Sequence, residues 1–173
     1  MKYHTHIRGF TLVETLVAVA ILTVAMVGPY TVASHAITAA FTARDELVAS
    51  GLAQEGVEYV RNVRDSNYLY NAANPGTPVS WLNGLSTCTP GPCVVDAAIS
   101  PSAIIAPLYL SSVGLYNQRS IGTISPFTRS VSITSVPVGA PTPTEVLVTV
   151  TVSWSTARVP HSVTVKEHIT NWQ

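Results

Sequence analysis

Residues near the start of the chain have types and spacing that suit proteolytic processing. Gly9 stands directly before an apolar run that extends from Phe10 to Tyr30. A secretory signal has its small-residue cleavage site after its apolar region, so a cut at Gly9 would instead leave the apolar run on the mature chain. Glu14 is the one side chain in this run that is charged at neutral pH. Because a carboxylate at membrane depth costs about 3 kcal/mol or more, Glu14 is a candidate functional residue.

The element that must position these residues is a membrane-spanning helix. Residues 10–30 would form a helix about 31 Å long, which matches the hydrocarbon core of a bilayer. Lys2 and Arg8 precede the run, and the next basic residue is Arg44. By the positive-inside rule, we expect a single-pass protein of the cytoplasmic (inner) membrane with its C-terminus outside. Three hydroxyls inside the run can bond helical carbonyls one turn back, those of Thr11, Thr15 and Thr23.

These residues carry a family resemblance. Arg8-Gly9-Phe10-Thr11-Leu12-Val13-Glu14 resembles the processing motif of type IV prepilins and pseudopilins. The resemblance implies that residues 1–9 are a leader, that a prepilin peptidase/methyltransferase cuts between Gly9 and Phe10, and that Phe10 becomes N-methylated. It also implies that Glu14 acts in assembly by neutralising the N-terminal amine of a neighbouring subunit. The implied partners are other pilin or pseudopilin subunits, an inner-membrane assembly platform and, before assembly, membrane lipid. His4 and His6 lie on the leader and are interpreted as solvated residues, not as metal ligands.

The helix is expected to continue outside the membrane over residues 31–66, ending near Asn67. Gly28-Pro29 should kink it, because proline removes one backbone hydrogen bond and clashes with the preceding turn. The segment 52–61 is similar to the corresponding stretch of minor pilins and pseudopilins. One helical face repeats at steps of three and four residues, namely Ala49, Ala53, Val57, Val60 and Arg64.

Residues 67–126 are rich in turn signals and are predicted to be a variable loop region, with short strands or a helical turn around Val94-Val95 and residues 103–110. Cys88 and Cys93 are the only cysteines and lie in Cys-Thr-Pro-Gly-Pro-Cys. Outside the cytoplasmic membrane such a pair favours a disulfide that pins a local turn. Two free thiols, or a metal or redox centre, remain alternatives, although the spacing is not that of a redox or zinc motif.

The last third of the chain alternates between apolar and polar residues with a period of two. The pattern predicts strands over 127–134, 146–154 and 162–169, joined by short connections into an antiparallel meander within residues 127–173. One face of this sheet is valine-rich and must be covered, and the helix before residue 66 is the available cover. The predicted fold class is therefore α+β, a long N-terminal apolar helix packed on a C-terminal antiparallel sheet, which is the plan that the pilin resemblance implies.

The composition of the chain and the motifs that it lacks argue against other classes of function. The 173 residues are 47% hydrophobic and only 10% charged, with a formal net charge of zero, so no direct nucleic-acid signal is visible. No nucleophile elbow, phosphate loop or metal-ligand pattern is present, and we expect no enzyme, no cofactor and no metal site. Acidic residues in the C-terminal third are isolated, so the calcium site of some major pseudopilins is not carried over.

The sequence therefore predicts a structural subunit, a minor pilin or pseudopilin, of a type IV pilus or a type II secretion pseudopilus. The alternative is a cell-surface binding or adhesive domain on a permanent signal anchor that does not join a filament. The leader separates the two hypotheses, because such an anchor needs neither Gly9-Phe10 nor Glu14.

Overall fold

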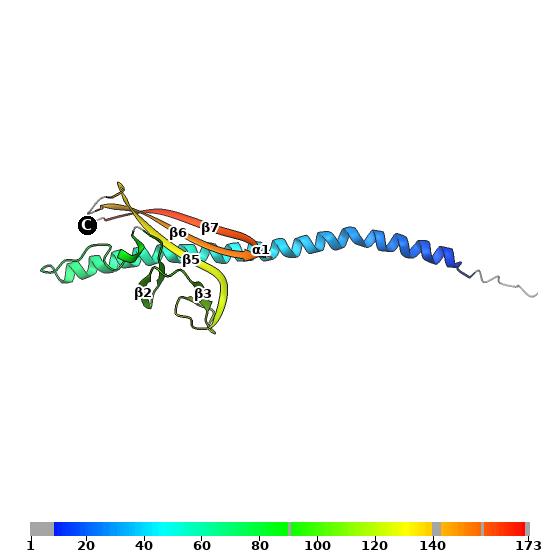
Figure 1. Cartoon of the computed structure of the whole chain (residues 1–173), viewed down its shortest axis with the longest axis horizontal. Coiled ribbons are helices and arrows are strands. Elements are labelled where there is room, and N and C mark those ends of the chain that lie inside the picture. The colour runs from blue at the N-terminus through cyan, green and yellow to red at the C-terminus, as the bar shows by residue number, and fades with distance from the viewer. Residues whose placement is uncertain (1–8, 90, 140–142, 157, 172–173) are drawn as a thin grey trace, which may run out of the picture. The chain divides into compact units, whose positions relative to one another are not determined.

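The computed structural model describes residues 9–89, 91–139, 143–156 and 158–171 of the chain (Figure 1). Lys2, His4, His6 and Arg8 of the expected leader lie outside the described residues, as do Pro90 of the cysteine loop, residues 140–142 and Ala157. The chain divides into two compact units, residues 1–44 and residues 45–173, and each is described by itself. We call residues 45–173 the head.

A single helix, α1 (Leu12–Ala73), contributes to both units. In the first unit its residues are solvent-exposed along their whole length, apart from the half-buried Thr42. The helix continues without a break through Pro29. Thr15 and Thr23 donate their hydroxyls to the carbonyls of Leu12 and Ala20 at 2.8 Å, as the sequence predicted. These bonds satisfy the hydroxyls within the helix itself.

The last three strands of the head form the predicted antiparallel meander. They are β5 (Thr123–Val136), β6 (Glu145–Thr156) and β7 (Val159–Thr170). β5 pairs with β6 in unbroken register from Thr128 opposite Ser153 to Val136 opposite Glu145. β6 and β7 pair along the whole of β7. The inward-facing residues of β5 and β6 alternate as predicted, since Val131, Ile133, Val148, Val150 and Val152 are all fully buried.

The region expected as a loop contains more structure than its sequence indicated. It holds a 3-10 turn, η1 (Ser86–Cys88), and four short strands, β1 (Val94–Asp96), β2 (Ile99–Ser102), β3 (Pro107–Leu110) and β4 (Tyr116–Asn117). β1 and β2 form a separate two-stranded sheet, while β3 and β4 extend the main sheet to five strands in the order β4-β3-β5-β6-β7. The sequence predicted short strands or a helical turn around Val94-Val95 and residues 103–110, and the structure has strands at both places. The pairing of β3 with the start of β5 was not predicted.

The head's core lies between α1 and the main sheet, with β1 and η1 closing one side (Figure 1). Four of the five residues predicted as the packing face of α1, Ala49, Ala53, Val57 and Val60, are buried there, together with Leu52 and Gly56, while Arg64 is half-buried. They belong to one buried cluster with the valines of β5 and β6, and this burial of apolar surface stabilises the head. The α+β, pilin-like fold class is confirmed.

The end of α1 corrects one prediction. The sequence placed the end near Asn67, but the helix continues to Ala73. The amide of Asn67 donates to the carbonyls of Trp81 and Asn83 at 3.0 Å, and Asn71 exchanges two hydrogen bonds with the backbone of Val79. In the sequence these asparagines indicate the end of a helix. In the structure they lie on the helix and hold residues 79–83, which follow it, against its side. The helix ends before Asn74-Pro75, where the proline disfavours a helical residue in front of it.

Candidate functional site

The Gly9–Phe10 bond lies in exposed, non-helical backbone immediately before α1. Gly9 has no neighbour within 4 Å of the position where a Cβ would stand, and its φ is not in the left-handed region. The fold therefore places no requirement for glycine at this position. Exposed terminal backbone of this kind is where proteases cut most readily.

Thr11 caps the N-terminus of α1. Its hydroxyl accepts a hydrogen bond from the backbone N–H of Glu14 at 3.3 Å, and its carbonyl accepts one from the N–H of Thr15 at 3.2 Å. Thr11-Leu12-Val13-Glu14 also has the sequence of a capping box, in which threonine and glutamate stand three residues apart. The helix consequently begins at Leu12. Only the cap, Thr11, separates it from Phe10, the residue that a cut after Gly9 would make the first of the chain. The sequence analysis expected the Thr11 hydroxyl to bond a helical carbonyl one turn back, but Thr11 precedes the helix and caps it instead. The Thr-x-x-Glu spacing could have revealed this role.

Glu14 lies in the first turn of α1 and is exposed. A negative charge there is favoured by the partial positive charge of the helix N-terminus. Its carboxylate forms no ion pair with any described residue of the chain. The carboxylate is therefore free to pair with a cation that another molecule supplies.

The helix that carries Glu14 is long and apolar enough to cross a membrane, by length and composition, and it is the one such helix among the described residues. None of its most apolar window is buried within the chain. Large side chains such as Phe10, Leu16 and Ile21 are 82%, 61% and 64% exposed. An apolar surface of this extent needs lipid or other helices to cover it.

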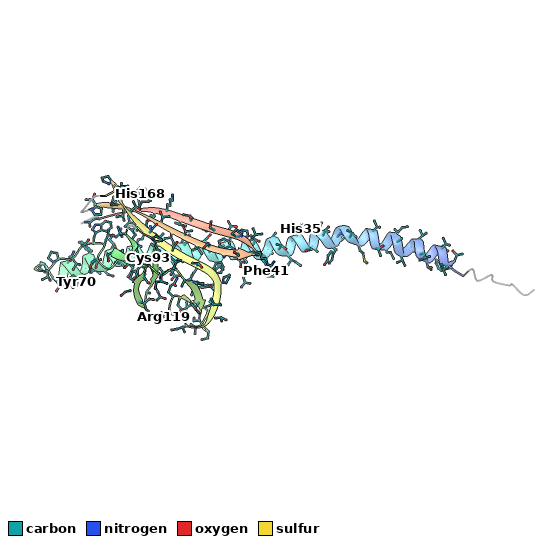
Figure 2. The ribbon with its side chains drawn as sticks, viewed as in Figure 1. His35, Phe41, Tyr70, Cys93, Arg119 and His168 are labelled. Carbon is teal, nitrogen blue, oxygen red and sulfur yellow. A yellow bond between two sulfur atoms is a disulfide. The ribbon has the colours of Figure 1, made fainter. Side chains whose placement is uncertain are left out.

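Cys88 and Cys93 are joined by a disulfide, and both are completely buried in the head's core (Figure 2). The backbone of Cys93 exchanges two 2.8 Å hydrogen bonds with Val131 of β5. The sequence interpretation had this bond pinning a local turn. The burial and the pairing with β5 show that the turn is also anchored to the main sheet. No group of three or more His, Cys, Asp or Glu side chains in the described part of the chain could hold a metal ion.

A buried arginine links α1 to the sheet. Arg129 of β5 is 3% exposed and donates to the carbonyl of Leu52 on α1 at 3.1 Å and to that of Val95 on β1 at 2.8 Å. Glu55 on α1 lies 3.2 Å away and supplies a partly exposed carboxylate. The sequence placed Arg129 on the inward face of its strand but assigned it no role. The signal in the sequence was an arginine among otherwise apolar residues on the inward face of the strand.

Asp96 is a second buried charge that the sequence left without a role. Its two carboxylate oxygens each accept a backbone N–H at 2.8 Å, from Ala98 and from Gln118, so it joins β1 to the segment after β4. The Arg119 guanidinium lies 4.0 Å away. Burial, with a smaller contribution from the charge of Asp96, raises the pKa of the Tyr59 phenol above its usual value. This network links β1 to the segment after β4.

Arg61 holds the outer part of α1 against β7. It pairs with Glu58 on α1 and also with Glu167 on β7. The hydrogen bond to Glu167 raises the pKa of Arg61 further above its usual value, helped by the charges of Glu167 and Glu58. The arginine is therefore charged under all conditions in which the protein folds.

Comparison with known proteins identifies one feature of the chain. Residues 5–28 match the family model of the prokaryotic N-terminal methylation motif. The match covers Gly9, Phe10 and Glu14 and ends before the head begins. No curated protein and no solved structure matches the chain significantly.

Proposed function

We propose that this chain, which its methylation motif marks as a type IV pilin-like precursor, is a structural subunit assembled into a type IV pilus or a type II secretion pseudopilus, as a minor pilin or pseudopilin. The motif is the type IV prepilin and pseudopilin signature, and proteins that carry it are structural rather than enzymatic. It implies processing by a prepilin peptidase and assembly with other pilins. The observation that carries the proposal is that this motif opens an apolar helix with no cover within its own chain.

Processing occurs between Gly9 and Phe10. The leader, residues 1–9, is removed, and the new amine of Phe10 is methylated. Support comes from Gly9, which the fold does not require to be glycine, and from its place in exposed backbone ahead of the Thr11 cap. The hydrogen bonds that the structure describes at the start of the helix join Thr11 to Glu14 and Thr15, and all three residues stay on the chain after the cut.

Glu14 sets the register of assembly. In lipid its charge is costly, and a partner's N-terminal amine relieves that cost. The support is an exposed carboxylate on an apolar helix, with no ion pair among the described residues. The membrane-inserted chain is then a reservoir, and the filament, in which apolar helices pack together, is the preferred state.

Before assembly the chain spans the cytoplasmic membrane once, with residues 10–30 in the bilayer, residues 31–73 in the outer half of the helix and the C-terminus outside. The basic residues Lys2 and Arg8 on one side and the long stretch without Lys or Arg on the other support this orientation. The Cys88–Cys93 disulfide suits the oxidising side of that membrane. The assembly platform in the inner membrane then extracts the processed subunit.

Replacement of Glu14 tests the proposal. The Glu14→Ala chain should be processed normally but should disappear from sheared or sedimented filaments, as measured by immunoblotting of the filament and membrane fractions. Glu46→Ala is the matched control, since Glu46 is an exposed acid on the same helix beyond the expected span. Unchanged incorporation of Glu14→Ala would remove the register role of Glu14. A wild-type chain that keeps residues 1–9 and never enters filaments would instead favour the anchored adhesive domain.

A further inference from the structure

The helix of the first unit satisfies most of its own polar side chains. Five threonine hydroxyls donate to carbonyls of the preceding turn, those of Thr15, Thr23 and Thr31 at 2.8 Å and those of Thr38 and Thr42 at 3.1 Å. Hydroxyls bonded in this way tolerate apolar surroundings, because the donor is not left unpaired. This part of α1 can therefore be covered by lipid or by other helices at little cost from its threonines.

Four polar side chains between Phe10 and Ala43 are not satisfied in this way. They are exposed, and the structure describes no side-chain hydrogen bond or ion pair for them among the described residues, namely Glu14, Tyr30, Ser34 and His35. An unpaired carboxylate costs far more to bury than an unpaired neutral hydroxyl. Glu14 is therefore the group that most needs a partner when apolar helices pack together.

His35 is the one side chain between Gly9 and Ala43 that can carry a positive charge, and Figure 2 shows it on the bare part of α1. Its imidazole supplies an N–H donor in either protonation state, while the carboxylate of Glu14 only accepts. The two groups cannot meet within one chain, because twenty-one residues of unbroken helix, about 31 Å, separate them. The side chain in this unit that complements Glu14 is thus available only from a second copy.

We infer that, in the filament, the imidazole of His35 donates a hydrogen bond to the Glu14 carboxylate of a second copy of this chain; this inference rests on the proposed filament function. The bond forms where apolar helices exclude water, so it is stronger than the same bond at an exposed surface. It does not displace the N-terminal amine as a partner of Glu14. A carboxylate has two oxygens and about four sites that accept hydrogen bonds, so one neighbour can supply the amine and another the imidazole.

The contact fixes the offset between the two copies. With their helices parallel, as membrane-inserted chains of one orientation are, the copies are displaced by about 31 Å along the helix axis. A residue four positions further along a helix lies on the same face, so Ala18 lies beyond Glu14 and Ala39 lies beyond His35. Ala18 of one copy therefore lies beside Ala39 of the other.

Cysteine crosslinking at these two alanines tests the offset. Ala18→Cys and Ala39→Cys are made in separate full-length chains with different epitope tags, and the two chains are produced together in cells that assemble the filament. Both positions are exposed, and the native cysteines are bonded and buried, so the native pair does not compete for the new thiols. Val32→Cys replaces Ala39→Cys in the matched control, because it is exposed on the same helix face about 10 Å away.

We expect oxidation of the filament fraction to give a dimer that carries both tags for Ala18→Cys with Ala39→Cys, and little or none for the Val32→Cys control. Filaments that contain both variants without this dimer would overturn the inference and leave the proposed function standing. A stronger band from the control, which would mean a different offset, would also overturn it. Failure of the wild-type chain to enter any filament would overturn the proposed function and the inference together.

Substitution of His35 tests the bond itself, by immunoblotting of the filament and membrane fractions. His35→Leu should lower incorporation into filaments by about tenfold or more with the leader removed as usual, because the Glu14 carboxylate of a neighbour loses a donor. His35→Gln keeps an N–H donor and should restore most of the incorporation. Thr38→Val is the matched control, since it removes a hydroxyl that the helix satisfies by itself. Incorporation of His35→Leu at the wild-type level would overturn the inference.

Discussion

Gly56 of α1 lies close against the sheet, and its replacement by alanine gives a measurable prediction. A Cβ at this position would stand 2.8 Å from Cγ1 and 3.3 Å from Cγ2 of Val150, and 3.5 Å from Cδ of Arg129. Val150 is fully buried in the middle of β6, and its β-branched side chain has few rotamers to choose from. The helix or the strand must therefore shift to make room.

Two opposing effects set the size of the change. Alanine is favoured over glycine inside a helix by about 1 kcal/mol. Overpacking a close-packed core costs about 1–3 kcal/mol. We expect Gly56→Ala to lower the free energy of unfolding of the head by between about 0 and 2 kcal/mol, since the two terms partly cancel.

Gly51 provides the matched control, because it lies on the same helix within the head but has nothing within 4 Å of its Cβ position. Gly51→Ala should therefore raise the free energy of unfolding by about 1 kcal/mol, so that the two variants differ by about 1–3 kcal/mol. Urea unfolding of the full chain in detergent, followed by the fluorescence of the buried Trp81 and Trp154, measures both. If Gly56→Ala proved as stable as Gly51→Ala, the close packing of α1 on β6 would be wrong.

Three further predictions concern the buried polar groups and the disulfide. In Arg129→Lys the shorter donor set cannot reach the carbonyls of Leu52 and Val95 together, so the free energy of unfolding should fall by about 1.5–3 kcal/mol. The control Arg158→Lys, at an exposed turn, should change the free energy of unfolding little. Equal stability of the two variants would contradict the link through Arg129. Joint replacement of Cys88 and Cys93 by alanine should lower the free energy of unfolding by about 2 kcal/mol in the same assay. Alkylation of the wild-type cysteines should require both reduction and unfolding. Labelling of the reduced, folded head would show that the pair is not buried. Because the pKa of Tyr59 is raised above its unfolded value, its contribution to stability is complete below about pH 10 and is lost as pH rises through the folded pKa. The tyrosinate absorbance that distinguishes wild type from Tyr59→Phe should therefore appear at a higher pH in the folded protein than in the protein unfolded in urea. Appearance at the same pH in both would refute the burial of Tyr59.

The regular part of the fold was predictable because its physics is local. Strict alternation on β5 and β6 placed Val131 and Val150 on the inward face, and the three-and-four spacing of α1 placed Ala53 and Val57 against them. The strand was predicted to begin at residue 127, but β5 begins at Thr123 and contains Pro126. Pro126 is tolerated where the pairing of β5 with β3 is irregular, between Ile124 and Thr128.

The arrangement of residues 97–124 could not be predicted, because irregular hydrogen bonds between side chains and backbone hold it together. Asn117 donates to the carbonyls of Tyr109 and Ile121 and accepts backbone N–H groups from Arg119 and Ile121. Gly122, at a φ of 105°, passes so close to the Leu110 backbone that no side chain fits. None of this has a periodic signal in the sequence. The candidate site shows the reverse, since Gly9, Phe10 and Glu14 are evident in the sequence, while their function depends on molecules outside the chain.

The mass of the mature protein tests the central claim most directly. Intact-mass spectrometry and N-terminal sequencing of the chain isolated from membranes and from filaments should find residues 1–9 absent, Phe10 first and one added methyl group on its amine. Gly9→Val should keep the leader, while Glu14→Ala should lose it as the wild type does. A mature chain that still contains residues 1–9 would contradict the assignment of this protein as a processed filament subunit.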